Sequence, residues 1–237
     1  MVNMQSQSSP LHNDMKPYQR ERNDLPHAPA SLCQKCGDSG YYSVPQGLVP
    51  CDCLLRKVKA VKFGENYADK TIENFIPKSL SGKNVQRMLT HSPDTSYLIT
   101  GAVGLGKTHL LAGLYEKLWH QYRFHTLVRK ELDLLEWLKT EKHWMLELQD
   151  NAIRLVQIDD LGKVKLAEWD IEKFFRFYDF ISSNKIILQI TTNLTPVEIK
   201  DVYGNAITDR LFRNNKCQIL TIRTADADKV ESDKNEM

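Results

Sequence analysis

The sequence predicts an α/β fold in which helices flank a mostly parallel sheet of five strands. From about residue 80 onward, short apolar runs alternate with segments whose apolar residues repeat at helical spacing. Strands that alternate with helices are joined by right-handed crossovers onto a mostly parallel sheet. The 237 residues are enough for one core of this kind with a small appendage, and too few for two full enzyme domains.

Five apolar runs are the predicted strands: Ser96 to Thr100, Phe124 to Val128, Leu155 to Ile158, Ile186 to Thr191 and Gln218 to Ile222. Between them, three segments place apolar residues on one face of a helix. The helical faces carry Leu111, Leu114, Tyr115, Leu118 and Tyr122, then Leu132, Leu135 and Leu138, then Ile171, Phe174, Phe175, Tyr178 and Ile181. We therefore expect an α/β sandwich.

Segments of different composition flank this core. Residues 1–30 contain four prolines and no periodic apolar pattern, which predicts a disordered N-terminal arm. Residues 31–65 form a cysteine module with a basic helix, residues 66–223 the core, and residues 224–237 an acidic tail predicted to be disordered. The tail holds five acids and two lysines, so the overall charge of +2 hides a charge of +5 on the other 223 residues.

The composition gives no sign of a membrane segment or an export signal. No stretch approaches 18 consecutive apolar residues, and the first ten residues are polar where a signal peptide would be apolar. We therefore expect a cytoplasmic protein without a membrane partner. In the reducing cytosol, crowded cysteines are more often metal ligands than disulfide partners.

Four of the five cysteines lie close together in the sequence. Cys33 and Cys36 form a C-x-x-C pair, and Cys51 and Cys53 form a C-x-C pair fourteen residues later. Four thiolates can close a tetrahedral Zn²⁺ site, whose binding energy folds a segment too small for a core of its own. We predict structural zinc; redox-active or unligated cysteines are the alternative. Cys217 is expected to be a small buried apolar residue.

A short basic amphipathic helix is predicted after the cysteines. Its apolar residues at helical spacing are Leu54, Leu55, Val58 and Val61, and its bases on other faces are Arg56, Lys57, Lys59 and Lys62. These bases are either a solvated face or a contact for DNA, and the whole module binds either protein or DNA. The segment Tyr67 to Phe75 follows as a predicted linker.

A glycine-rich segment lies between the first predicted strand and the helix that follows it. It reads Gly101-Ala102-Val103-Gly104-Leu105-Gly106-Lys107-Thr108 and fits the pattern G-x-x-x-x-G-K-[ST]. Its glycines let backbone N–H groups and the helix N-terminus converge on an anion. Lys107 can reach the β- and γ-phosphates, and the Thr108 hydroxyl can join Mg²⁺. The segment predicts a P-loop for a nucleotide; a plain glycine-rich turn is the alternative.

Two carboxylates end the strand Leu155 to Ile158. Asp159 and Asp160 should lie at the C-terminal edge of the parallel sheet, where sites form in α/β folds. Asp159 would hold Mg²⁺ through its water shell, and Asp160 would orient or polarise an attacking water. A simple cap of the turn before Gly162 is the alternative.

Two polar positions follow later strands. Asn193 follows the strand Ile186 to Thr191. Its side chain would contact the γ-phosphate or the attacking water, or would have a role in the turn alone. Arg210 and Arg213 lie on a predicted short helix before the last strand. An arginine there can stabilise transition-state charge from a neighbouring subunit, and a solvated surface arginine is the alternative.

In combination, these motifs resemble the AAA+ ATPases of the DnaC/DnaI type, which are bacterial and phage replicative-helicase loaders, with the transposition helper IstB as a close cousin. The resemblance covers residues 31–222 and rests on the cysteine cluster and five further motifs. These are Ala-x-x-x-x-Glu-Asn-Phe at 68–75, Gly-Lys-Thr-His-Leu at 106–110, Ile-Asp-Asp-Leu-Gly at 158–162, Thr-Thr-Asn-Leu at 191–194 and Asp-Arg-Leu at 209–211.

The resemblance implies roles for several residues. It makes Asp159 and Asp160 the Walker B pair, Asn193 sensor 1 and Arg210 the arginine finger. Asp160 stands where AAA+ proteins generally have Glu, Ala206 stands where many members carry another arginine, and no residue is assigned as sensor 2.

The function implied is an ATPase, slow and stimulated by partners, that uses ATP, Mg²⁺ and Zn²⁺. Its partners would be a hexameric DnaB-like replicative helicase and single-stranded DNA. The residues left for the core allow no C-terminal helical lid, so a neighbouring subunit or partner would complete the ATPase site. An IstB-like DNA-binding transposition helper is the main alternative; a small-molecule P-loop kinase and a non-catalytic zinc adaptor are two others.

Overall fold

The computed structural model describes residues 33–45, 47–122 and 125–228. The predicted arm, Phe124 at the start of the second predicted strand, and positions 229–237 of the predicted tail lie outside the described residues. No helix in the described ranges is long and apolar enough to cross a membrane.

The main sheet has five strands, all parallel, as the sequence predicts. In spatial order they are β4 (Thr126–Lys130), β5 (Leu155–Leu161), β6 (Ile187–Thr192), β3 (Tyr97–Gly101) and β7 (Gln218–Ile222). Each neighbouring pair is parallel, so the carboxyl ends of all five strands meet at one edge. The predicted P-loop after β3, the aspartate pair near the end of β5 and Asn193 after β6 all lie at this edge.

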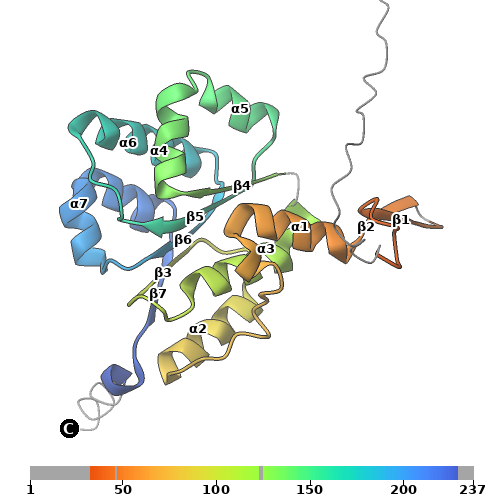
Figure 1. Ribbon diagram of the computed structural model, residues 1–237. Coiled ribbons are helices and arrows are strands. Elements are labelled where there is room, and N and C mark those ends of the chain that lie inside the picture. The colour runs from red at the N-terminus through yellow and green to blue at the C-terminus, as the bar shows by residue number, and fades with distance from the viewer. Residues whose placement is uncertain (1–32, 46, 123–124, 229–237) are drawn as a thin grey trace, which may run out of the picture.

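Helices cover both faces of the sheet (Figure 1). The helices on one side are α2 (Leu80–His91) and α3 (Lys107–Tyr122). Those on the other are α4 (Glu131–Thr140), α5 (Trp144–Asp150), α6 (Glu168–Ser183) and α7 (Pro196–Asp209), the last continuing into a π-helical turn, Arg210–Asn214. The three predicted helices are confirmed as α3, α4 and α6. The helices α2, α5 and α7 were not predicted, and the short helix expected to carry Arg210 and Arg213 is the π-helical turn after α7.

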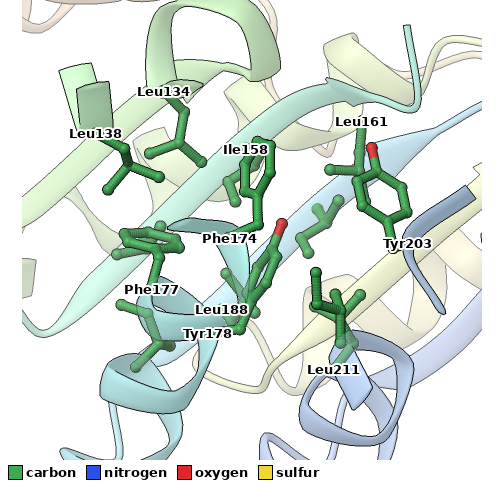
Figure 2. Close-up of a cluster of buried hydrophobic side chains, with 14 of the residues drawn as sticks. Leu134, Leu138, Ile158, Leu161, Phe174, Phe177, Tyr178, Leu188, Tyr203 and Leu211 are labelled. Atoms are coloured by element: carbon green, nitrogen blue, oxygen red, sulfur yellow. The ribbon is translucent and has the colours of Figure 1, made fainter. Parts of the chain in front are cut away.

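Side-chain alternation along the strands divides the core in two. In β3, Leu98 faces the cluster of α4, α6 and α7, whereas Tyr97 and Ile99 face the cluster of α2 and α3. Figure 2 shows the first cluster, in which Phe174 and Phe177 of α6 lie between the strands and α4. The sheet is therefore buried on both faces, and its carboxyl edge is left for the functional residues.

The cysteine module is a hairpin followed by a helix. Strands β1 (Tyr41–Val44) and β2 (Gly47–Pro50) pair antiparallel, and α1 (Asp52–Phe63) follows. The hairpin points away from the main sheet, whereas α1 packs against α3 (Figure 1). The helix thus connects the module to the core.

The predicted faces of α1 are wrong at two positions. Lys59 is 0% exposed, and Val61 is 87% exposed. Lys59 donates hydrogen bonds to the carboxylate of Glu116 on α3 and to the carbonyl of Lys70. Because a buried ammonium is tolerated only with such partners, Lys59 fastens α1 to the core and is neither solvated nor free to contact DNA.

Replacing Lys59 with methionine should lower the free energy of unfolding by about 2 kcal/mol, because Glu116 and the Lys70 carbonyl lose a charged donor. The measurement is denaturant unfolding. The control is Lys57→Met on the same helix, whose side chain is 61% exposed and which should change stability by less than about 0.5 kcal/mol. Equal effects of the two substitutions would contradict the role of Lys59.

The predicted linker is packed onto the core. After a 3-10 turn at Glu65–Tyr67, Ile72 is 0% and Phe75 7% exposed, both within the cluster of α2 and α3. A Cβ at Gly113 on α3 would lie 2.6 Å from the backbone nitrogen of Ile72, so a glycine is required for this close approach. The linker prediction is therefore wrong, and its apolar residues at 72 and 75 were the missed signal.

The structure also extends past the predicted start of the tail. Residues 225–228 form a helical turn, and the Asp228 carboxylate accepts hydrogen bonds from the Ser81 backbone N–H at 2.8 Å and hydroxyl at 2.9 Å. An anionic side chain at this end of α2 is favoured by the helix dipole. The first acids of the tail therefore belong to the folded unit, which corrects the boundary predicted at residue 224.

Candidate functional site

The glycine-rich loop joins the end of β3 to the start of α3. Gly101 has φ 151°, and a Cβ there would lie 2.3 Å from the Ile222 carbonyl oxygen, so neighbouring β7 forces a glycine at this position. Gly106 has φ 82°, and a Cβ there would lie 2.6 Å from Cε2 of Phe75. The loop is thus held between β7 and the packed segment that precedes it.

Lys107 begins α3 and is enclosed by its own loop. Its ammonium donates hydrogen bonds to the carbonyls of Gly101 and Ala102, each at 2.8 Å, and the residue is 6% exposed. Burial lowers the pKa of Lys107, and the charges of Asp160 and Asp159 oppose that shift. The cation therefore lies inside the loop that the sequence predicts to bind phosphate.

Asp159 lies beside the loop and is bound by two threonine hydroxyls. Thr108 donates to its Oδ1 at 3.0 Å, and Thr191 of β6 donates to the same oxygen. Asp159 is 4% exposed; burial, together with the charge of Asp160, raises its pKa. Thr191 was not predicted as a site residue, although its place in the strand before Asn193 was a signal. A hydroxyl and a carboxylate in contact are oxygen ligands of the kind that Mg²⁺ uses.

Asp160 has an unusual backbone conformation. Its φ is 62°, and the register between β5 and β6 is irregular between Ile158 and Leu161. The backbone N–H of Asp160 donates to the Thr191 hydroxyl at 3.0 Å, and its carboxylate pairs with Lys163 at 2.7 Å. Such a bulge turns a side chain that would otherwise follow the strand's alternation, so Asp160 is not a simple continuation of β5.

Asn193 directly follows β6, with its side chain partly exposed. The turn is tied to the neighbouring strand because the Thr100 hydroxyl at the end of β3 donates to the Leu194 carbonyl. Asn193 therefore lies at the same sheet edge as the loop and the two aspartates.

Arg210 lies apart from these residues, at the end of α7. Its Nε donates to Asp179 of α6 at 3.1 Å, and its guanidinium lies 4.0 Å from the ring centre of Phe175. The side chain is 25% exposed. In this chain the guanidinium of Arg210 is thus held against α6 and is partly open to solvent.

The segment before the loop contributes residues that the sequence analysis did not assign. Phe75 packs against both Gly106 and the ring of His109, 5.3 Å away. His109 Nε2 donates to the Thr71 carbonyl at 2.9 Å, and burial lowers its pKa. His109 lies on α3, as expected from its position after the loop, and fastens residues 71–75 beside the P-loop.

The four crowded cysteines meet in one cluster. All four Sγ atoms lie within 4.8 Å of one another, with Cys33 and Cys51 at 3.7 Å and Cys36 and Cys53 at 3.3 Å. Hydrogen bonding to Cys36, together with burial, raises the pKa of Cys53 to about 12. Four thiols this close match the ligand set of a tetrahedral zinc site, in which the cation would favour the thiolates.

Cys217 is separate from this cluster. It is 7% exposed and packs among apolar residues, as predicted. Burial raises the pKa of its thiol to about 12, which keeps it protonated and unreactive.

No protein-family model matches the chain. The chain is 27% identical over 151 residues to the chromosomal replication initiator protein DnaA of Borreliella burgdorferi, which covers 60% of this chain and 30% of that protein. It is 29% identical over 143 residues to DnaA of Treponema denticola, covering 55% of this chain and 30% of that protein. The chain thus spans 30% of the length of these curated relatives.

Solved structures decide the fold. A crystal structure of the DnaC helicase loader matches with a TM-score of 0.57 and 20% identity over 67% of this chain and 99% of that one. The chain has the fold of the DnaC-type AAA+ proteins. DnaI matches with a TM-score of 0.51 and 16% identity over 65% of this chain and 91% of that one. DnaA bound to AMPPCP and single-stranded DNA matches with a TM-score of 0.54 and 17% identity, over 70% of this chain and 54% of that one.

This DnaC-type fold confirms the predicted α/β class and the resemblance on which the site assignments rest. The named relatives are AAA+ proteins of DNA replication, loaders and initiators, and AAA+ proteins of this kind are in general ATPases. The roles of the individual residues remain predictions.

Proposed function

We propose that the chain is a zinc-containing ATPase of DNA replication that binds a hexameric, DnaB-like replicative helicase and helps to load it onto single-stranded DNA. ATP binding and hydrolysis would act as the switch. In this proposal residues 66–228 are the ATPase core, and the cysteine module with α1 is the part that contacts the helicase. The fold shared with the DnaC helicase loader supports this function over the other P-loop classes.

The observation that carries the proposal is the contact between Thr108 and Asp159. These residues come from two separately recognised motifs, 51 positions apart, and their oxygen atoms lie 3.0 Å apart at the carboxyl edge of the sheet. The enclosed Lys107 ammonium lies beside them in the P-loop. A cation that binds phosphate, and a hydroxyl and a carboxylate that can hold Mg²⁺, are groups that phosphoryl transfer requires.

Each residue then has a distinct task. The backbone of residues 101–106 and Lys107 would bind the phosphates, and Thr108 and Asp159 would hold Mg²⁺, which neutralises the charge of the transferred phosphoryl group. Asp160 would accept a proton from, or orient, the attacking water, and Asn193 would contact the γ-phosphate from the next strand. The ion pair with Lys163 is made by one oxygen of Asp160, Oδ2, and holds the carboxylate beside the loop that follows β5.

Loading on a circular single strand tests this function. The purified chain, the replicative helicase of its host and a circular single-stranded DNA are mixed with ATP, and helicase that co-elutes with the circle is measured. We expect the chain to increase the retained helicase with ATP and not with ADP. Retention that is independent of the chain would contradict helicase loading, and ATP-dependent binding of the chain to DNA without helicase would favour the transposition-helper alternative.

Replacing Arg210 with alanine should leave ATP affinity within about twofold and lower hydrolysis by about a thousandfold in the assembled protein, as for an arginine finger. The measurement is steady-state ATP hydrolysis at a concentration where the chain or the chain–helicase complex is assembled. Arg213→Ala is the matched control, because Arg213 is on the same turn and its side chain is 81% exposed. Equal rates for the two variants would remove the finger role.

A further inference from the structure

Glu131, the first residue of α4, is a buried carboxylate beside the predicted nucleotide site. It is 1% exposed, although acids at a helix start normally face solvent. Its Oε2 accepts hydrogen bonds from the backbone N–H groups of Gly162, Lys163 and Val164 at 2.9, 2.8 and 3.0 Å. These three residues follow the aspartate pair almost directly, so one carboxylate oxygen binds the first half of the loop between β5 and α6.

This loop needs an outside contact to keep its shape. Asp160 and Gly162 have φ values of 62° and 94°, and Lys163 is exposed to solvent. Left-handed backbone is costly at a non-glycine residue and persists where surrounding contacts hold it. Three charge-assisted hydrogen bonds to a buried carboxylate supply that contact, and they also offset the cost of burying the charge.

The bound loop determines where Asp160 can lie. Lys163 donates its backbone N–H to Glu131, and its ammonium pairs with the Asp160 carboxylate at 2.7 Å. A shift of the loop would therefore move both the backbone next to Asp160 and the cation that pairs with it. Thr191 also contacts both Asp159 and the backbone of Asp160, so loop position and metal-binding position are linked.

The second oxygen of Glu131 faces α7. The Tyr203 hydroxyl donates to Oε1, and Tyr203 is 1% exposed, with its ring 6.1 Å from that of Phe174. Burial and the charge of Glu131 raise the pKa of Tyr203 far above its usual range, so the hydroxyl keeps the proton that it donates. Tyr203 directly precedes the kink at Gly204, after which the chain leads to Arg210.

We propose that Glu131 is a positioning residue for ATP hydrolysis: it holds the loop after Asp160 in register with α7, the helix that leads to Arg210. The inference rests on the proposed ATPase function and adds a residue that no motif assigns. The hydrogen bonds of Glu131 go to residues 162–164 and to Tyr203, and not to the P-loop or to Asp160. Its effect should therefore fall on the catalytic step and leave nucleotide affinity unchanged.

The test compares Glu131→Ala, Glu131→Gln and the control Glu136→Ala, a side chain on the exposed face of α4. ATP hydrolysis and the affinity for a fluorescent ATP analogue are measured on the full chain with helicase and single-stranded DNA. We expect Glu131→Ala to lower kcat about tenfold or more with affinity within about twofold. The side-chain oxygen of glutamine can still accept hydrogen bonds from the three backbone N–H groups. The kcat of Glu131→Gln should therefore be within about threefold of that of the unsubstituted chain.

Three outcomes would overturn the inference: an unchanged kcat in Glu131→Ala, an equal loss of kcat and affinity, or a glutamine variant as slow as the alanine variant. If Glu131→Ala fails to fold, kcat and ATP affinity of Glu131→Gln and Tyr203→Phe are the measurements that test the inference. Tyr203→Phe should lower kcat about threefold with unchanged affinity, and no effect would overturn the link to α7. An unsubstituted chain that binds ATP but never hydrolyses it would instead overturn the proposed ATPase, and the inference with it.

Discussion

Replacing Lys107 with alanine should abolish ATP binding and hydrolysis, while the fold is retained. The Lys107 ammonium is the one cation placed inside the loop, within 2.8 Å of the carbonyls of Gly101 and Ala102. With bound nucleotide it would exchange these carbonyls for phosphate oxygens, which an alanine cannot contact. We expect at least a hundredfold weaker affinity, about 3 kcal/mol. The measurement is a titration with a fluorescent ATP analogue.

The control for Lys107→Ala is Lys83→Ala on the exposed side of α2, which should bind ATP normally. Thermal unfolding without nucleotide should show both variants folded, because the hydrogen bonds of the Lys107 ammonium go to two carbonyls of its own loop and to no other element. Unchanged ATP affinity in Lys107→Ala would defeat the P-loop assignment and, with it, every role given to Asp159 and Asp160.

Changing Cys33 and Cys36 to serine should remove one zinc ion per chain and unfold the hairpin, with α1 and the core intact. The module contains one two-stranded hairpin, and none of the described residues 33–50 belongs to a buried apolar cluster. Apart from the cysteines, residues 33–40 are joined to the start of α1 by the Cys51 N–H bond to the Gly40 carbonyl, at 2.8 Å, and by exposed ion pairs of Lys35 with Asp52 and of Lys57 with Asp38. A structural zinc contributes about 10–16 kcal/mol to such a module. Metal analysis and amide hydrogen exchange measure the two effects.

The pattern of exchange makes this zinc prediction specific. Residues 33–50 should lose protection, whereas α1 should keep it because Lys59 fastens the helix to Glu116 and the Lys70 carbonyl. The control is Cys217→Ala, which removes a buried thiol of the core and should leave the zinc content unchanged. A metal-free chain whose hairpin is as protected as that of the zinc-bound protein would refute the module.

The sequence predicts the sheet and three of its helices because these elements have strong local patterns. The strands β3, β5 and β6 are short, buried and mostly apolar runs, and on α6 Phe174, Tyr178 and Ile181 of the predicted face are buried. By contrast, α2 has few apolar residues: Val85 and Leu89 are buried, but Leu80 and Met88 are exposed. Its clearest local signal was Ser79, whose hydroxyl accepts the Gly82 N–H as a helix cap.

The candidate site divides in the same way. The P-loop and the aspartate pair are contiguous motifs, so the sequence alone predicts them. Glu131 acts on residues 162–164, more than 30 positions away, and Lys59 on Glu116, 57 positions away. Such contacts depend on how helices pack, and a charged side chain at a helix start or on a polar face is ordinarily solvated. No periodic or spacing pattern in one sequence distinguishes these buried charges from exposed ones.

The most direct test of the central claim is a nucleotide-dependent pull-down of the host's replicative helicase by the full chain. The chain is immobilised, and helicase is captured with ATP, with ADP and on the Lys107→Ala variant. The proposed switch predicts that the amount of captured helicase differs between ATP and ADP, and that Lys107→Ala captures the same amount with either nucleotide. No helicase captured under any condition, or equal capture by the unsubstituted chain with ATP and ADP, would contradict a nucleotide-switched helicase loader.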